Sequence, residues 1–100
     1  MSNRKKQRNK EQVQKSQIIA FTPNGWEDYQ YWKQHDSSIS QKIDDLIKDC
    51  LRNPHKGIGK PEPLIGDLTG FWSRRITQEH RLVYAFEDNT LTIIMCRYHY

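Results

Sequence analysis

Four side chains in the second half of the chain could together perform acid–base chemistry on a phosphate ester. Glu62 could accept a proton, and His99 could donate one, because an imidazole titrates near neutral pH. The guanidinium groups of Arg75 and Arg81 could each bind two phosphate oxygens. RNA can be cleaved without a metal when its own 2′-hydroxyl attacks the adjacent phosphorus, and that reaction needs a base, an acid and cations of this kind.

Further aromatic and basic side chains accompany these four. Tyr98 and Tyr100 could stack on an unpaired base or form hydrogen bonds to it. Lys60 could reach a phosphate of RNA or could simply be solvated. Arg74 and Arg75 are neighbours in a predicted strand, so their side chains point to opposite faces and only one can line a site. We assign Arg75 to the site and expect Arg74 on the surface, where it is either solvated or in contact with RNA.

The local sequence alone does not decide the role of Glu62. Pro61 and Pro63 fix the backbone on both sides of it, so the carboxylate is presented by a stiff segment. Taken by itself, however, that pattern favours an ordinary exposed acid in a proline-rich loop. His80 directly precedes Arg81 and is expected to point away from it in a structural role. His35 and His55 are expected on the surface.

The elements that must hold these side chains follow from periodicity. Runs rich in β-branched and aromatic residues predict strands at residues 17–21, 71–76, 81–86 and 91–96. Residues 87–90 predict a tight hairpin connection between the last two strands. Three neighbouring strands with an apolar face can support a sheet, which would form a rigid base for the basic groups.

Two helices are predicted before the sheet. Trp26, Tyr29 and Trp32 recur at helical spacing within residues 24–35, after Thr22 or Asn24 as the cap, and such aromatic residues usually belong to a core. Residues 39–51 carry a strong amphipathic pattern of apolar side chains, which follows a break and cap at residues 36–38. The short break predicts an antiparallel helical hairpin that covers one face of the sheet. Residues 55–70 predict a long connection, and such loops in small domains are often functional.

The bulk composition limits the class of protein. One hundred residues predict one domain, and the absence of a long apolar run or an apolar signal region predicts a cytoplasmic protein. Cys50 and Cys96 stand at apolar positions, which favours buried free thiols over a disulfide. The spacing of Cys and His residues resembles no zinc site, and we expect no metal or other cofactor.

Positive charge is concentrated at the N-terminus. Residues 1–17 contain six basic side chains and one acidic one, a net charge of +5, whereas the remainder contains ten and eleven, a net charge of −1. Residues 1–16 have too few apolar side chains to order themselves, so we expect a disordered extension before a domain at 17–100. The charge suits a polyanion such as RNA or a merely solubilising surface, and charge alone does not decide between them.

Several motifs in one order give the chain a specific resemblance. The residues that carry it are Gly59-Lys60-Pro61-Glu62-Pro63-Leu64, Leu68-Thr69-Gly70-Phe71-Trp72-Ser73-Arg74-Arg75-Ile76, Glu79-His80-Arg81-Leu82-Val83-Tyr84 and Cys96-Arg97-Tyr98-His99-Tyr100. Together they resemble the YoeB toxins of the Txe/YoeB branch of the RelE superfamily. The resemblance covers about residues 17–100 and gives no role to the basic extension.

The resemblance implies a fold, an activity and partners. The fold would be α+β, a compact RelE-like domain with a twisted, mainly antiparallel sheet packed against an N-terminal helical hairpin. The activity would be that of a type II toxin that cuts mRNA in the ribosomal 30S A site. The catalytic groups would be Glu62 as base, His99 as acid and Arg81, with Tyr100 and Arg75 at the RNA.

The implied partner is a Phd/YefM-type antitoxin, which covers the active site and, with the toxin, represses the shared operon. Operator DNA would then be contacted only through the antitoxin, no membrane would be involved, and a toxin homodimer stays open. Two rivals to the enzyme remain: an RNA- or ribosome-binding inhibitor that does not cut, and a protein whose main work is regulatory binding to the antitoxin.

Overall fold

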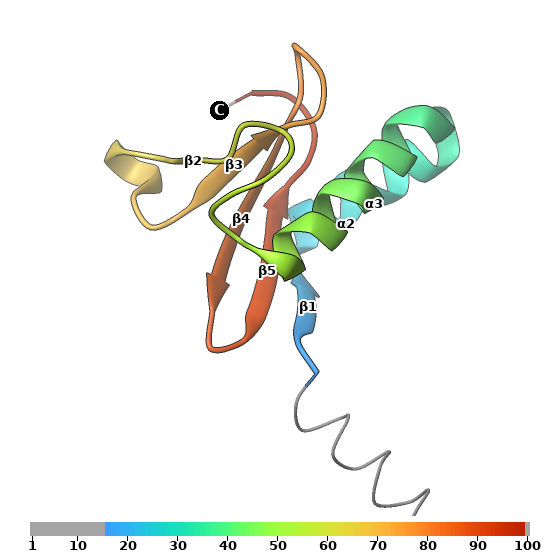
Figure 1. Cartoon of the computed structure of the whole chain (residues 1–100). Helices are drawn as coiled ribbons and strands as arrows, with labels where there is room; N and C mark the ends of the chain where they lie inside the picture. The colour runs from blue at the N-terminus through green and yellow to red at the C-terminus, as the bar shows by residue number, and fades with distance from the viewer. Residues whose placement is uncertain (1–15, 100) are drawn as a thin grey trace, which may run out of the picture.

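The computed structural model describes residues 16–99 and arranges them as two helices against one sheet (Figure 1). The predictions for the extension 1–16, apart from Ser16, and for Tyr100 fall outside these residues. The helices are α2 (Pro23–His35) and α3 (Ser37–Arg52), with a short 3₁₀ helix η1 (Gly66–Leu68). The strands are β1 (Ile18–Phe21), β2 (Glu62–Pro63), β3 (Trp72–Arg75), β4 (Arg81–Glu87) and β5 (Thr90–Met95).

The five strands form one sheet in the order β1-β5-β4-β3-β2. Only the β1–β5 pair is parallel, so the prediction of a mainly antiparallel sheet is confirmed. Asp88 and Asn89 connect β4 to β5 with positive φ angles of 51° and 59°, as a two-residue hairpin turn requires. The chain end curves back from β5 toward β3 at the end of the sheet opposite this turn (Figure 1).

Side-chain caps begin both helices where the sequence predicts them. Thr22 Oγ1 accepts a hydrogen bond from the Gly25 amide at 3.0 Å, and Pro23 occupies the first turn of α2. Asp36 accepts hydrogen bonds from the amides of Ser38 and Ile39, both at 3.1 Å. These bonds satisfy amides of the first helical turns that have no partner inside the helix. Because Asp36 caps the end of α2 and the start of α3, the break between the two helices is short.

The core lies between the helical hairpin and one face of the sheet. Its buried side chains are Trp32, Ile43, Leu46, Ile47, Cys50, Ile76, Leu82, Tyr84, Leu91, Ile93 and Cys96. Gly25 lets α2 approach β5 closely, because a Cβ there would overlap the carbonyl oxygen of Ile93.

Cys50 and Cys96 are buried free thiols, as predicted. Burial raises the pKa of the Cys50 thiol to about 11 and that of Cys96 to about 12, so neither is a ready nucleophile at neutral pH.

Two expectations about the fold need correction. Trp26 is not a core residue: it is 51% exposed and packs edge-on against the ring of Phe21 at 5.4 Å. The connection at residues 55–70 is not only a loop, because it contains the two-residue strand β2 and the helix η1. Strand β2 extends the sheet at its β3 edge, where it pairs Glu62 with Ser73. Among the described residues, the structure contains no helix long and apolar enough to cross a bilayer.

Candidate active site

The register of three strands brings Glu62, Arg75 and Arg81 to one face of the sheet. Glu62 pairs with Ser73, and Arg75, two residues further along β3, pairs with Arg81. Directly paired residues and residues two apart in a strand share a face. The opposite face carries Leu82 and Tyr84, which pack against the helices. We call the side with Glu62, Arg75 and Arg81 the open face, and on it Glu62 and Arg75 are exposed.

Arg81 is held firmly at the open face. Only 9% of it is exposed, and its Nη1 donates to the carbonyl oxygens of Thr77 at 2.7 Å, Gln78 at 3.1 Å and His80 at 3.1 Å. These bonds fix the guanidinium against the turn that joins β3 to β4. Because Arg75 pairs directly with Arg81, two positively charged residues are neighbours across the strands, and their like charges repel each other. An anion bound close to both would offset that repulsion.

The chain end reaches this site because helix α2 holds it. The Cys96 amide donates to Asp28 Oδ2 at 3.1 Å, and Trp32 Nε1 donates to the Cys96 carbonyl at 2.8 Å. The guanidinium of Arg97 lies over the Tyr31 ring, 3.6 Å from its centroid. Burial raises the pKa of the Asp28 carboxyl, although the Cys96 amide and the charge of Arg97 offset part of that rise. The last residues are therefore fastened at consecutive positions.

His99 is brought to the start of β4. The Arg81 amide donates to the Tyr98 carbonyl oxygen at 3.0 Å. Tyr98, the residue directly before His99, is therefore bonded to the backbone of Arg81, which could bind phosphate. Tyr98 is 59% exposed and His99 is also exposed. The predicted role of Tyr100 at the RNA concerns a residue outside the described part of the chain. The contacts of Cys96, Arg97 and Tyr98 hold the chain end in place, and the sequence did not predict them.

Lys60 lies beside Arg75 at the entrance to β2. The Arg75 amide donates to the Gly59 carbonyl oxygen at 2.6 Å, and Lys60 follows with a positive φ of 51° and an exposed side chain. Lys60 is thus available for an anion near the two arginines.

His35 and His55 are exposed, as expected. His80 makes packing and hydrogen-bond contacts, in agreement with its predicted structural role.

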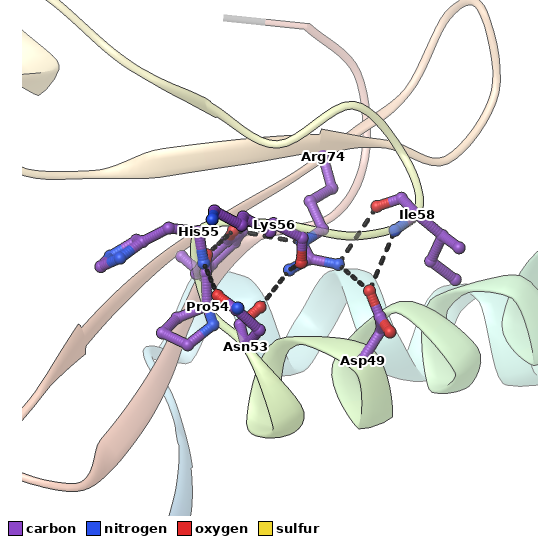
Figure 2. Close-up of polar contacts among 8 residues, drawn as sticks. Asp49, Asn53, Pro54, His55, Lys56, Ile58 and Arg74 are labelled. Carbon is purple, nitrogen blue, oxygen red and sulfur yellow. Dashed lines mark hydrogen bonds and ion pairs between the residues drawn. The ribbon is translucent and has the colours of Figure 1, made fainter.

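The expectation that Arg74 lies on the surface is wrong. Its side chain is 0% exposed and lies on the helix-facing side of β3, because the face opposite to Arg75 is the covered one. Arg74 Nη1 bonds to Asp49 Oδ2 at 2.5 Å and to the Ile58 carbonyl at 3.1 Å. Its Nη2 donates to the carbonyls of Asn53 at 2.6 Å and Lys56 at 2.9 Å (Figure 2). In this position Arg74 cannot contact RNA.

Arg74 instead organises the segment that leads to Glu62. Figure 2 shows the guanidinium between the end of α3 and the loop at residues 53–58. Carbonyls at a helix C-terminus have no partner inside the helix, and this buried cation satisfies that of Asn53, the residue that caps α3. Its hydrogen bond is the main reason that the pKa of the Asp49 carboxyl lies below its usual range. Arg74 Nε also donates to the Tyr84 hydroxyl at 3.2 Å, and that hydroxyl donates to the Pro54 carbonyl at 2.6 Å.

Sequence reasoning missed the residues that hold the site together. Asp28, Trp32 and His80 make contacts with residues 96–98 that are 18 to 68 positions away along the chain. No local pattern distinguishes Asp28 from the other polar residues of α2. Residues 16–99 contain no group of three or more His, Cys, Asp or Glu side chains that could hold a metal. The side chains already named can supply acid–base and electrostatic chemistry.

Comparison with known proteins places this arrangement in a family. Residues 21–100 match the model of the YoeB-like toxin of bacterial type II toxin–antitoxin systems. Toxin YoeB of Escherichia coli K12 is 56% identical over 82 residues, which cover 82% of this chain and 98% of that protein.

Two solved structures from Staphylococcus aureus agree in fold. The YoeB–YefM complex contains a chain 48% identical to this one, with a TM-score of 0.79, and the match covers 84% of this chain and 98% of that chain. The YoeB dimer matches with 49% identity, a TM-score of 0.79 and the same coverage. The predicted α+β fold and the predicted family are confirmed: the chain belongs to the YoeB-like toxins of bacterial type II toxin–antitoxin systems.

Proposed function

We propose that this toxin is a ribosome-dependent mRNA endoribonuclease that cuts in the A site and so inhibits translation in the cytoplasm. The observation that carries the proposal is the strand register, which puts Glu62, Arg75 and Arg81 on one open face with the fastened chain end beside Arg81. A carboxylate, two guanidinium groups and an imidazole are the groups that metal-free RNA cleavage needs.

In this mechanism Glu62 takes the proton of the 2′-hydroxyl, and the resulting oxygen attacks the adjacent phosphorus. The bond from phosphorus to the 5′-oxygen breaks, and His99 gives its proton to that leaving oxygen. One product then ends in a 2′,3′-cyclic phosphate and the other begins with a 5′-hydroxyl. Arg75 and Arg81 bind the phosphate oxygens as negative charge develops on them, and each such electrostatic contact is worth roughly 10²-fold in rate.

The exposure of the site supports dependence on the ribosome. Glu62, Arg75 and His99 are all exposed, and charges in contact with bulk water stabilise a transition state weakly. A ribosome that covers the open face would exclude that water and would also hold the mRNA in line. Lys60 then contacts backbone phosphate, and Tyr98 and Tyr100 stack on or bond to an unpaired base.

The partners follow from the relatives. The Staphylococcus aureus relative is found in complex with YefM, and another structure is a YoeB dimer. We propose that a Phd/YefM-type antitoxin binds this chain, covers the open face and joins it in repressing the operon, so that DNA contact is made through the antitoxin. Self-association without the antitoxin is proposed on the same ground.

Mapping of mRNA cleavage on programmed ribosomes tests the enzymatic proposal. The wild-type protein should cut in the A site and leave a 2′,3′-cyclic phosphate, and His99→Ala should lower the single-turnover rate by roughly 10²-fold or more. His35→Ala removes a histidine from the exposed end of α2 and is the matched control, with an unchanged rate. Translation arrest without any cut would favour a binding inhibitor, and full activity of His99→Ala would remove the imidazole from the mechanism.

A further inference from the structure

The residue before His99 is held on both sides by two consecutive residues, His80 and Arg81. The Tyr98 amide donates to His80 Nδ1 at 2.7 Å. The Tyr98 carbonyl oxygen accepts from the Arg81 amide at 3.0 Å. Both polar groups of this peptide position are thus bonded to the start of β4, directly beside the guanidinium that is proposed to bind phosphate.

Tyr98 needs such support because of its backbone conformation. Its φ is +66°, in the left-handed region that residues other than glycine rarely adopt. A disfavoured conformation persists only where the surroundings determine it. It also sets the direction in which the chain continues, so the two hydrogen bonds that hold Tyr98 bear on the position of the His99 backbone.

His80 is itself fixed by its neighbours. Its ring packs edge-on against Trp32, with centroids 4.8 Å apart, and Trp32 in turn bonds to the Cys96 carbonyl. The His80 amide donates to Thr77 Oγ1 at 3.1 Å, and its carbonyl accepts from the Ile76 amide at 3.0 Å. The His80 ring is thus held by Trp32 and its backbone by Thr77 and Ile76, so His80 can fix the position of Tyr98.

The hydrogen bond defines which nitrogen of His80 carries a proton. A backbone amide can only donate, so Nδ1 must be unprotonated and the neutral ring carries its proton on Nε2. His35 offers the opposite case within the same protein. Its Nδ1 lies 2.8 Å from the Tyr31 carbonyl oxygen, which can only accept, so the proton is on Nδ1 there.

We propose that His80 is a positioning residue for the general acid: through the Tyr98 amide it sets the orientation of His99 without contacting RNA. This inference rests on the proposed function of His99. It assigns to His80 a part in catalysis that depends on one acceptor atom, and not merely on the packing of the ring against Trp32.

Two substitutions separate the acceptor atom from the bulk of the side chain. In His80→Asn the amide oxygen occupies nearly the place of Nδ1 and can still accept from Tyr98. In His80→Gln the oxygen lies further out, near the place of Nε2. We expect His80→Gln to lower single-turnover cleavage on ribosomes by roughly 10- to 100-fold, as a misplaced catalytic group does. His80→Asn should stay within a few fold of wild type, with the two thermal midpoints alike, and His35→Asn is the control.

Nitrogen NMR of the histidine rings at mildly alkaline pH tests the geometry without measuring activity. The expected result is an unprotonated Nδ1 on His80 and a protonated Nδ1 on His35. A protonated Nδ1 on His80, or equal cleavage by the Asn and Gln variants, would overturn the proposal. If His99→Ala cleaves at the wild-type rate, the proposed role of His99 as general acid fails instead, and the ring protonation of His80 still decides whether its bond to Tyr98 exists.

Discussion

Arg74 and Arg75 are adjacent in β3 but belong to two different regions of the molecule. Arg74 is buried on the helix-facing side, where Asp49, the Tyr84 hydroxyl and three carbonyl oxygens accept its hydrogen bonds. Arg75 is exposed on the open face, opposite Arg81. A guanidinium whose donors are all used inside the protein supports the fold, whereas one that stands exposed beside a like charge is suited to an external anion.

The two faces of the sheet therefore serve different functions. The helix-facing side fixes the segments that come before and after the site: Arg74 holds the loop ahead of Glu62, and Trp32 and Asp28 hold the chain end ahead of His99. The open face carries the groups proposed to meet RNA. Substitution of Arg74 on the first side should therefore change stability, and substitution of the exposed Glu62 or Arg75 on the second should change activity alone.

Removal of Arg74 should have the largest effect on stability. Arg74→Ala leaves the carbonyls of Asn53, Lys56 and Ile58 without their donor, and we expect a loss of about 3 kcal/mol or more in the free energy of unfolding. Arg75→Ala, one position away, should change it by less than about 0.5 kcal/mol. Urea denaturation of both proteins measures the difference. Equal stability of the two variants would contradict the conclusion that Arg74 supports the fold and Arg75 does not.

Removal of Arg75 should affect cleavage and little else. Without this guanidinium the developing charge on the phosphate loses one cation, and we expect a decrease of about 10²-fold in the single-turnover rate of mRNA cleavage on ribosomes. Arg52→Ala, which removes an exposed arginine at the end of α3, is the control and should cleave normally. A wild-type rate for Arg75→Ala would mean that Arg81 alone supplies the charge.

The buried network should also make stability depend on pH, with a smaller effect. Because the bond from Arg74 lowers the pKa of Asp49 in the folded state, its contribution is present above the unfolded value near 3.8 and is lost as the pH falls through the lower folded value. Asp49→Asn should therefore flatten the fall of stability in acid, as measured by denaturation at a series of pH values. An unchanged slope would show that Asp49 is not ionically coupled to Arg74.

The main elements could be predicted because their patterns are local. The apolar period of α3, the caps at Thr22 and Asp36 and the β-branched and aromatic runs of β4 and β5 all lie within short windows. Strand β2 could not be predicted in the same way, since two residues, one of them proline, show no alternation. It exists because Glu62 and Pro63 pair with β3.

The sequence names candidate residues for the site but not the contacts that hold them in place. Alternation in β3 correctly separated Arg74 from Arg75, yet it could not say which face the helices cover. The partners of Arg74 lie 10 to 25 positions away, and those of Cys96 lie in α2, so no local pattern records them. The motifs name the residues of the site, but the long-range contacts that position them are visible only after the chain has folded.

Substitution of Glu62 by Gln shows whether the open face performs the chemistry. The matched control is Glu87→Gln, which changes an exposed acid at the other end of β4 from Arg81. We predict that Glu62→Gln lowers the single-turnover rate of mRNA cleavage on programmed ribosomes by roughly 10²-fold or more, with an unchanged thermal midpoint, and that Glu87→Gln alters neither. Cleavage by Glu62→Gln at the wild-type rate would contradict the account.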